Sequence, residues 1–324
     1  MKRIIPLCLA LIMTVGLLAG CGKQNEQTAS DETRLRVVTT IFPEYDWVRE
    51  ILGDKADNAE VTMLLDNGAD LHSYQPTADD IVKISECDLF IYVGGESDDW
   101  VDDALKNAAN KNMKVVNLLE ALGERVKTEE VVEGMQEEEH DHEEEAEYDE
   151  HVWLSLKNAQ TLCSAISAVL QQIDPDNKDT YAANASAYIK KLSALDADYQ
   201  AAVDAATRKT VLFGDRFPFR YLAEDYGLRY YAAFAGCSAE SEASFETISF
   251  LAGKVDELNL PCVLTIEGVQ HKIAETIVRN TAAKNQKVLT MDSMQSTTSK
   301  DAANGTTYLS VMERNLSVLK EALG

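Results

Sequence analysis

Short apolar runs alternate with longer amphipathic segments along the chain from residue 35 onward. The apolar runs have strand length, and the segments between them place their apolar residues at helical spacing. In the first half we expect strands at 35–41, 60–65, 88–93 and 114–118, with helices at 44–52, 78–85 and 98–109. This order is typical of a parallel sheet with crossover helices, so the first half predicts an α/β lobe.

The second half repeats this pattern after a long helical stretch. Helical spacing covers 154–173, stops at Asp174-Pro175-Asp176, and resumes over 178–206 without an internal Gly or Pro. Strands are then expected at 211–213, 229–234, 262–266 and 287–291, with helices at 219–225, 245–259, 272–283 and 308–323. The sequence therefore predicts two similar parallel-sheet α/β lobes, 35–176 and 208–324, joined by one long rigid helix at 177–207.

The first 34 residues have the pattern of an export signal followed by a tether. Lys2 and Arg3 precede an apolar run at 4–18, which is shorter than the roughly 20 residues of a membrane span. Residues 18–21, Leu-Ala-Gly-Cys, resemble the lipobox of bacterial lipoproteins, in which cleavage leaves a lipidated cysteine. We expect a signal peptide at 1–20, a lipid on Cys21, a flexible tether at 21–34, and an extracytoplasmic protein anchored to the membrane.

Negative charge is the main feature of the composition. The formal net charge of -25 argues against nucleic acid and favours cations as partners. Much of this charge lies at 128–150, where apolar residues are few, so we expect a disordered acidic loop there. His140 and His142 lie within it and could form a weak metal trap, the alternative being a plain solvated spacer.

The cysteines show no metal-binding spacing. Two lie in the export signal, and Cys87, Cys163, Cys237 and Cys262 are scattered without a Cys-x-x-Cys pair. No thiolate zinc site is expected on that basis. Cys237 and Cys262 both flank predicted strands of the second half, which leaves two alternatives, a disulfide or two buried thiols.

Candidate metal ligands follow the predicted strands or open the next helix. Ligands of open α/β sheets bind near the carboxyl ends of strands. His72 follows the second strand, His151 precedes the helix after the acidic loop, and Asp215 and Asp292 follow two strands of the second half. Each alone could be an ordinary loop residue or helix cap. Together, two imidazoles and one or two carboxylates suit zinc or manganese.

Four segments carry a resemblance to a known family. They are 68–77 (Gly-Ala-Asp-Leu-His-Ser-Tyr-Gln-Pro-Thr), 151–159 (His-Val-Trp-Leu-Ser-Leu-Lys-Asn-Ala), 219–228 and 308–316. They resemble the zinc and manganese receptors of bacterial ABC importers over essentially the whole mature chain. The resemblance implies a monomer that binds a divalent metal ion outside the membrane and passes it to a permease with its ATPase. It also implies that His72 and His151 are ligands.

The chain departs from this family at the third ligand. The family usually places His or Glu three residues before the aromatic residue of its Phe-x-Tyr motif, and here that position holds Arg216, which has no free lone pair. Asp215 is adjacent, Asp292 matches an Asp of some members, and Glu267 matches a family carboxylate and is a reserve candidate. Two His with one or two Asp would weaken the preference for zinc over manganese, whereas the His-containing acidic loop favours zinc.

Three other functions are alternatives to a zinc receptor. A zinc hydrolase is suggested only by His140-x-His142, and the chain has no His-Glu-x-x-His, Gly-x-Ser-x-Gly or phosphate-binding Gly-rich loop, so an enzyme is not expected. A manganese or iron receptor of the same family is one alternative. A surface adhesin or a metal buffer without a transport role is another, and the sequence does not exclude it.

Overall fold

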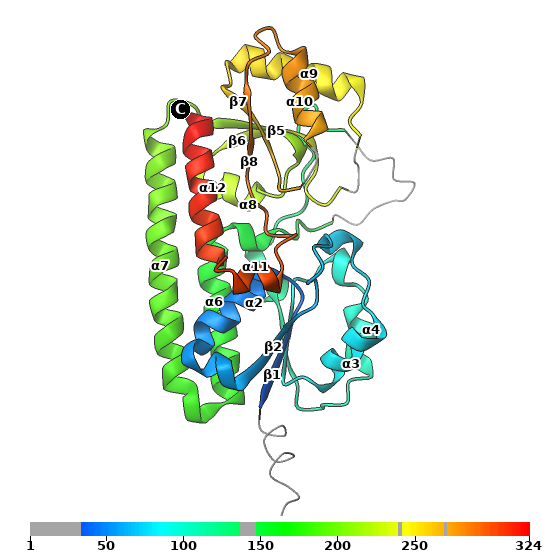
Figure 1. Cartoon of the computed structure of the whole chain (residues 1–324), viewed down its shortest axis with the longest axis vertical. Helices are drawn as coiled ribbons and strands as arrows, with labels where there is room; N and C mark the ends of the chain where they lie inside the picture. Colours follow the sequence, from blue (N-terminus) through cyan, green and yellow to red (C-terminus); the bar gives the residue numbers. More distant parts are fainter. Residues whose placement is uncertain (1–33, 137–146, 239–241, 269–270) are drawn as a thin grey trace, which may run out of the picture. The chain divides into compact units, whose positions relative to one another are not determined.

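The amino-terminal half contains a four-stranded sheet. The computed structural model describes residues 34–136, 147–238, 242–268 and 271–324. The strands are β1 (Leu35–Thr39) and β2 (Ala59–Met63), both labelled in Figure 1, with β3 (Leu89–Tyr92) and β4 (Lys114–Asn117). Their order in the sheet is β2-β1-β3-β4. β3 is parallel to β1 and to β4. The helices of this half are α2 (Phe42–Leu52), α3 (Ala78–Glu86), α4 (Val101–Lys106) and α5 (Leu118–Leu122).

The carboxyl-terminal half repeats this strand order. β5 (Thr210–Arg216), β6 (Arg229–Phe234), β7 (Cys262–Thr265) and β8 (Lys287–Thr290) form a parallel sheet in the order β6-β5-β7-β8. Helices α8 (Arg220–Tyr226), α9 (Phe245–Leu258) and α10 (Lys272–Asn280) accompany it. Its core includes Leu212, Phe234, Leu251 and Val263, all 1% exposed or less. The prediction of two similar α/β lobes is therefore confirmed.

Long helices connect the two sheets. α6 (Leu156–Ile173) packs against α7 (Lys178–Ala205), whose 28 residues span about 42 Å at 1.5 Å per residue. α7 also contacts α2 of the first half and α8 and α12 (Tyr308–Leu323) of the second, and α12 runs beside it in Figure 1. Tyr199 of α7 donates from its hydroxyl to the Met312 carbonyl at 2.6 Å. The long helix is thus packed against helices of both halves.

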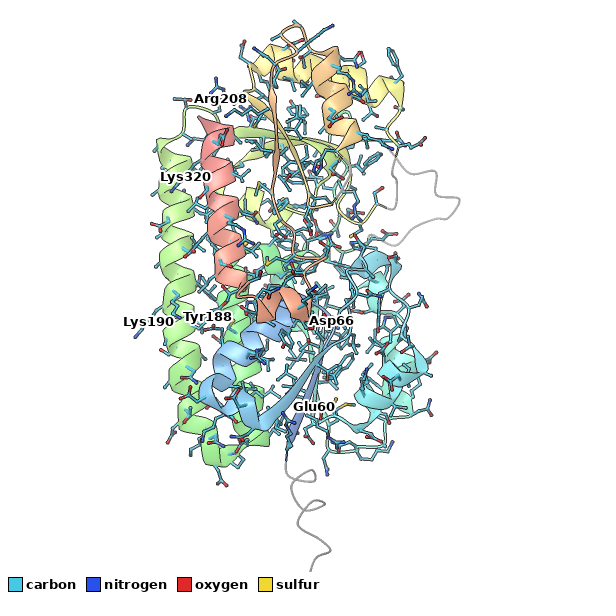
Figure 2. The ribbon with its side chains drawn as sticks, viewed as in Figure 1. Glu60, Asp66, Tyr188, Lys190, Arg208 and Lys320 are labelled. Atoms are coloured by element: carbon cyan, nitrogen blue, oxygen red, sulfur yellow. The ribbon has the colours of Figure 1, made fainter. Side chains whose placement is uncertain are left out.

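Buried polar contacts join the halves near the ends of these helices. Tyr308, at the start of α12, donates its backbone N–H to the Asp46 carboxylate (2.9 Å) and its hydroxyl to the Trp153 carbonyl (2.6 Å). The Trp153 indole N–H donates to the Ser293 carbonyl at 2.9 Å. A second connection lies at α11 (Ser299–Ala303), where Ser299 donates to the Asp66 carboxylate, which is labelled in Figure 2.

Several predicted boundaries differ from the structure. The α6 helix begins two residues later than expected because the Ser155 hydroxyl caps it, accepting the Asn158 N–H at 3.0 Å. Helices α5 and α11 were not predicted, and the expected helix at 98–109 is confined to α4. In the described part of the chain, no helix is both long and apolar enough to cross a membrane.

The prediction of a disordered loop over 128–150 is wrong for its described flanks. Thr128 and Tyr148 form an antiparallel bridge, and Gln136 donates its N–H to the Ala233 carbonyl at 2.9 Å. Met135 is buried, so even this acidic segment supplies one apolar contact to the core. The predicted trap residues His140 and His142 lie outside the described residues, as do the predicted signal peptide, Cys21 and nearly all of the tether.

Candidate metal centre

A short helical turn holds His72 in place after β2. Residues Leu71–Ser73 form one 3-10 turn, and the Asp70 carboxylate caps it by accepting the His72 N–H at 3.0 Å. Leu71 is fully buried and anchors the turn in the core. The backbone of His72 is therefore held both by a cap and by apolar packing.

His151 occupies a fully buried position between the acidic segment and α6. The Asp149 carboxylate accepts the His151 backbone N–H at 2.9 Å, and the same oxygen lies 3.0 Å from the ring Nδ1. The ring lies between the rings of His72 and Trp153, with centroid distances of 5.2 and 5.3 Å. One carboxylate thus positions both the backbone and the ring of His151.

The two imidazoles turn their Nε2 atoms toward each other at 3.2 Å. Tetrahedral zinc with bonds of about 2.0–2.1 Å to nitrogen would hold two ring nitrogens about 3.3 Å apart. Their Nδ1 atoms face oxygens: His72 Nδ1 lies 2.9 Å from Ser97 Oγ and 3.4 Å from a Glu150 oxygen, and His151 Nδ1 faces Asp149. A ring whose Nδ1 carries the proton has its free lone pair on Nε2. Two such rings place these lone pairs face to face, and a bound cation would relieve the repulsion between them.

The electrostatic surroundings keep His72 neutral. Burial, followed by the neighbouring His151 and Arg216, lowers the pKa of His72 to about 3, and the negative charge of Asp70 only partly opposes this shift. Neutral imidazole is the form that binds metal ions. At neutral pH, His72 therefore presents a lone pair without first losing a proton.

Arg216, at the end of β5, lies across from the His72 turn. Its guanidinium forms an ion pair with the Asp70 carboxylate and lies 3.4 Å from the Ser238 carbonyl. Burial opposes ionisation of Asp70, but the hydrogen bond and charge of Arg216 hold its pKa below the usual value. Asp70 therefore caps the His72 turn and also compensates the Arg216 charge.

The predicted carboxylate ligands are engaged elsewhere in this structure. Asp215 accepts from the Thr265 hydroxyl (2.6 Å) and from the Arg216 N–H, and Asp292 accepts the Met294 N–H at 2.8 Å. The reserve candidate, Glu267, accepts three hydrogen bonds from Ser293 and Gln295. None of the three belongs to the histidine cluster found among the described residues. They stay predicted ligands that mutation must test.

Cys237 lies close to both histidines, although the sequence did not single it out as a candidate ligand. Its Sγ and one ring nitrogen each of His72 and His151 all lie within 4.8 Å of one another. The sequence offered a signal, because Cys237 follows the carboxyl end of β6, the same kind of position that singled out Asp215 and Asp292. The absence of a Cys-x-x-Cys pair excludes only a metal site built from two cysteines that are close in sequence. It does not exclude a single cysteine ligand. All four described cysteines are free thiols, which settles the open question about Cys237 and Cys262.

Known proteins are similar to this chain in sequence and fold. The family model described as zinc-uptake complex component A, periplasmic (ZnuA), matches residues 37–322. The zinc-binding lipoprotein AdcA of Streptococcus pneumoniae is 33% identical over 326 residues, covering 99% of this chain and 61% of AdcA. The high-affinity zinc uptake system protein ZnuA of Bacillus subtilis is 32% identical over 317 residues, covering 95% of this chain and 94% of that protein.

A solved structure extends the comparison. The crystal structure of the Zn(II)-bound ZnuA-like domain of Streptococcus pneumoniae AdcA matches with a TM-score of 0.69 and 30% identity, covering 90% of this chain and 99% of that domain. The chain spans less than two thirds of full-length AdcA but nearly all of the Bacillus protein. Because the family model covers both lobes and the long helix between them, this chain belongs to the ZnuA family of zinc-uptake components.

Proposed function

We propose that this protein is an extracytoplasmic receptor that captures zinc and delivers it to an ABC importer. The observation that carries the proposal is the pair of Nε2 atoms at 3.2 Å, with the outer ring nitrogens facing oxygens. Zinc binding by AdcA and zinc uptake by the Bacillus protein, as their names state, support the same cargo. In this proposal the zinc ion is transported and takes part in no reaction, so the site needs no catalytic water.

The location and partners form part of the same proposal. We expect cleavage before Cys21, lipid attachment to that cysteine, and a monomer that meets a membrane permease and its ATPase. The name of the AdcA relative, a lipoprotein, supports the anchor. The net charge of -25 would raise the local concentration of cations around such an anchored receptor.

Zinc is favoured over manganese by the donor types. Two of the three side chains in the cluster are imidazoles, and imidazole suits zinc, whereas manganese prefers carboxylate, carbonyl and water oxygens. Asp215 and Asp292 stay candidate ligands, because each accepts a hydrogen bond from Thr265 or Met294 and a carboxylate still has further lone pairs. His140 and His142 are proposed as a weak, separate trap for incoming ions.

Titration calorimetry with zinc and manganese tests this proposal. Wild-type protein should bind one zinc ion tightly, and His72→Ala or His151→Ala should weaken that binding about a hundredfold, since one ligand contributes roughly 3 kcal/mol of a zinc site. The matched control is His271→Ala, because His271 contacts Thr265 and is outside the cluster. Unchanged zinc affinity in both cluster variants would contradict the proposed site.

A growth experiment tests the transport role. Deletion of the gene should slow growth in chelated medium, and added zinc or the wild-type gene should restore it. Growth equal to that of the parent strain under zinc limitation would count against a transport receptor and favour a metal buffer or an adhesin.

A further inference from the structure

Cys237 lies where a third donor to the histidine pair would be needed. It follows β6, and its backbone N–H donates to the Glu129 carboxylate at 2.9 Å, so the described acidic flank fixes its position. Its Sγ and the two imidazoles form the one group of three His, Cys, Asp or Glu donors that meets within 4.8 Å among the described residues. These donors come from three separate segments of the chain.

The backbone before Cys237 is built for a close approach to His151. A Cβ on Gly236 would come within 3.0 Å of His151 Cε1 and Nδ1, so a larger residue there would push the turn away from the ring. Zinc bonds of about 2.0–2.1 Å to nitrogen and 2.3 Å to sulfur would need nitrogen–sulfur separations of about 3.6 Å. The sulfur–nitrogen distances in the structure are at most 4.8 Å, so they exceed the distance needed for zinc by at most about 1.2 Å. One side-chain rotation can supply a shift of that size.

Other residues near the histidine pair are poorly suited to this role. Arg216 cannot donate a lone pair, and its charge is already paired with Asp70. Asp215 binds the Thr265 hydroxyl. A thiolate would instead supply a lone pair and would complete three protein ligands with His72 and His151.

We infer that Cys237 is a metal ligand and that, with His72 and His151, it makes a soft site selective for zinc and cadmium over manganese. This inference rests on the proposed receptor function and extends it to the metal class of the site. Binding forms a sulfur–metal bond and breaks the S–H bond, and the proton leaves to solvent. Thiolate ligands select soft and borderline ions, so the cysteine would discriminate against manganese more strongly than a carboxylate could.

Spectroscopy on the purified full-length protein tests the bond directly. Cobalt(II) or cadmium(II) bound to the wild type should give a near-ultraviolet sulfur-to-metal charge-transfer band, and Cys237→Ser should abolish it. X-ray absorption of the zinc-loaded wild type should detect one sulfur neighbour at about 2.3 Å, a readout that needs no variant. The matched control is Cys262→Ser, which removes a buried thiol on β7 and should leave the band intact.

Affinity separates this inference from the receptor proposal. Cys237→Ser should weaken zinc binding about a hundredfold, while Cys237→His should retain tight zinc binding without the band. Tight zinc binding by a wild type that lacks the band and the sulfur neighbour would overturn the role of Cys237 and leave the receptor proposal standing. Absence of tight zinc binding by the wild type would overturn both.

Discussion

The two lobes use their polar side chains in opposite ways around the candidate metal centre. In the amino-terminal lobe, Asp149 lies against Nδ1 of His151, Ser97 lies against Nδ1 of His72, and the two Nε2 atoms are 3.2 Å apart. In the carboxyl-terminal lobe, Asp215 and Glu267 accept hydrogen bonds from their own lobe. The carboxylates near the strand ends of the carboxyl-terminal lobe are thus held by hydrogen bonds, whereas the two imidazoles turn their Nε2 atoms toward each other.

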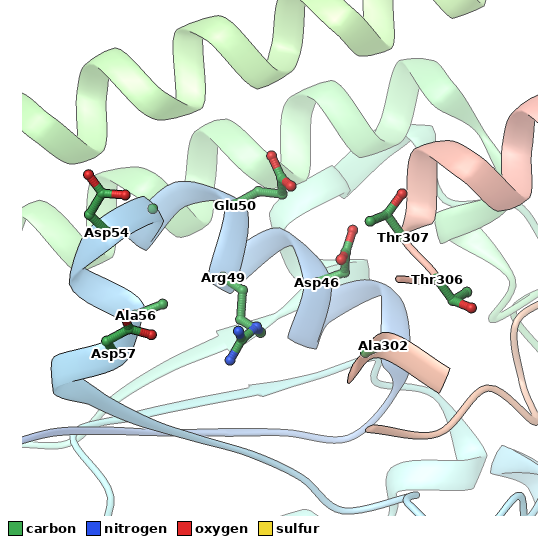
Figure 3. Close-up of a pocket in the computed structure, with 10 residues that line it drawn as sticks. Asp46, Arg49, Glu50, Asp54, Ala56, Asp57, Ala302, Thr306 and Thr307 are labelled. Atoms are coloured by element: carbon green, nitrogen blue, oxygen red, sulfur yellow. The ribbon is translucent and has the colours of Figure 1, made fainter. Parts of the chain in front are cut away.

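The largest expected effect concerns a buried carboxyl group of the amino-terminal lobe that serves stability rather than binding. Asp46 lines an acidic pocket with Glu50, Asp54 and Asp57 (Figure 3). Burial raises its pKa to about 7. Between pH 4 and 7 the folded protein holds a proton that the unfolded chain has lost, so the free energy of unfolding should fall as pH rises, by up to about 4 kcal/mol.

Asp46→Asn should remove this part of the pH dependence, because Asn stays neutral and can still accept from the Tyr308 N–H. Urea unfolding of the metal-free protein at pH 4, 5.5 and 7.5 measures it. Asp179→Asn, at an exposed position on α7, is the matched control and should keep the wild-type slope. An equal slope for wild type and Asp46→Asn would show that Asp46 does not titrate in this window.

The next effect separates stability from binding in the carboxyl-terminal lobe. Glu267→Ala leaves the Ser293 N–H, the Ser293 hydroxyl and the Gln295 N–H without their acceptor, and should cost about 3 kcal/mol of unfolding free energy. Zinc affinity of the folded variant should change less than about fivefold, or about 1 kcal/mol. Thermal unfolding and calorimetry measure the two quantities.

Exposed Glu313→Ala is the control for this substitution, and it should change neither quantity. A Glu267→Ala variant of normal stability that has lost tight zinc binding would identify Glu267 as a ligand and reverse the comparison between the lobes.

In the amino-terminal lobe, loss of a positioning carboxylate should affect binding. Asp149→Asn removes the charged acceptor at His151 Nδ1 and should weaken zinc binding about 10- to 100-fold, the range typical of groups that orient metal-binding histidines. Calorimetry measures the change. Tyr148→Phe, at the exposed neighbouring residue, should bind as the wild type does. Equal affinities of all three proteins would exclude a positioning role for Asp149.

The smallest effect is expected for the two aspartates that the sequence suggested as ligands. Asp215→Asn and Asp292→Asn should each change zinc affinity less than about threefold, because both residues lie outside the histidine cluster and accept hydrogen bonds from Thr265 and Met294. A loss of a hundredfold or more in either variant would show that its loop rearranges when the metal binds.

Most of the fold could be predicted because its signals are local. The expected ranges 229–234 and 308–323 coincide with β6 and α12, where strand and helical patterns are strong and the ends are well marked. The α5 and α11 helices were missed because five residues are too few to show helical spacing. The local pattern predicts disorder in the acidic flanks, because the burial of Met135 and the bridge between Thr128 and Tyr148 depend on distant segments.

The sequence by itself determined the two-lobed α/β order, the long helix, and His72 and His151 as candidates, because each is encoded in a short window of residues. Only the tertiary structure decided that Cys237 lies within 4.8 Å of the histidine nitrogens, that Arg216 pairs with Asp70, and that Asp215 accepts a hydrogen bond from Thr265. Sheet register and helix packing determine which side chains from distant segments come into contact. These contacts decide whether a donor atom is already hydrogen-bonded, and a local sequence pattern does not predict them.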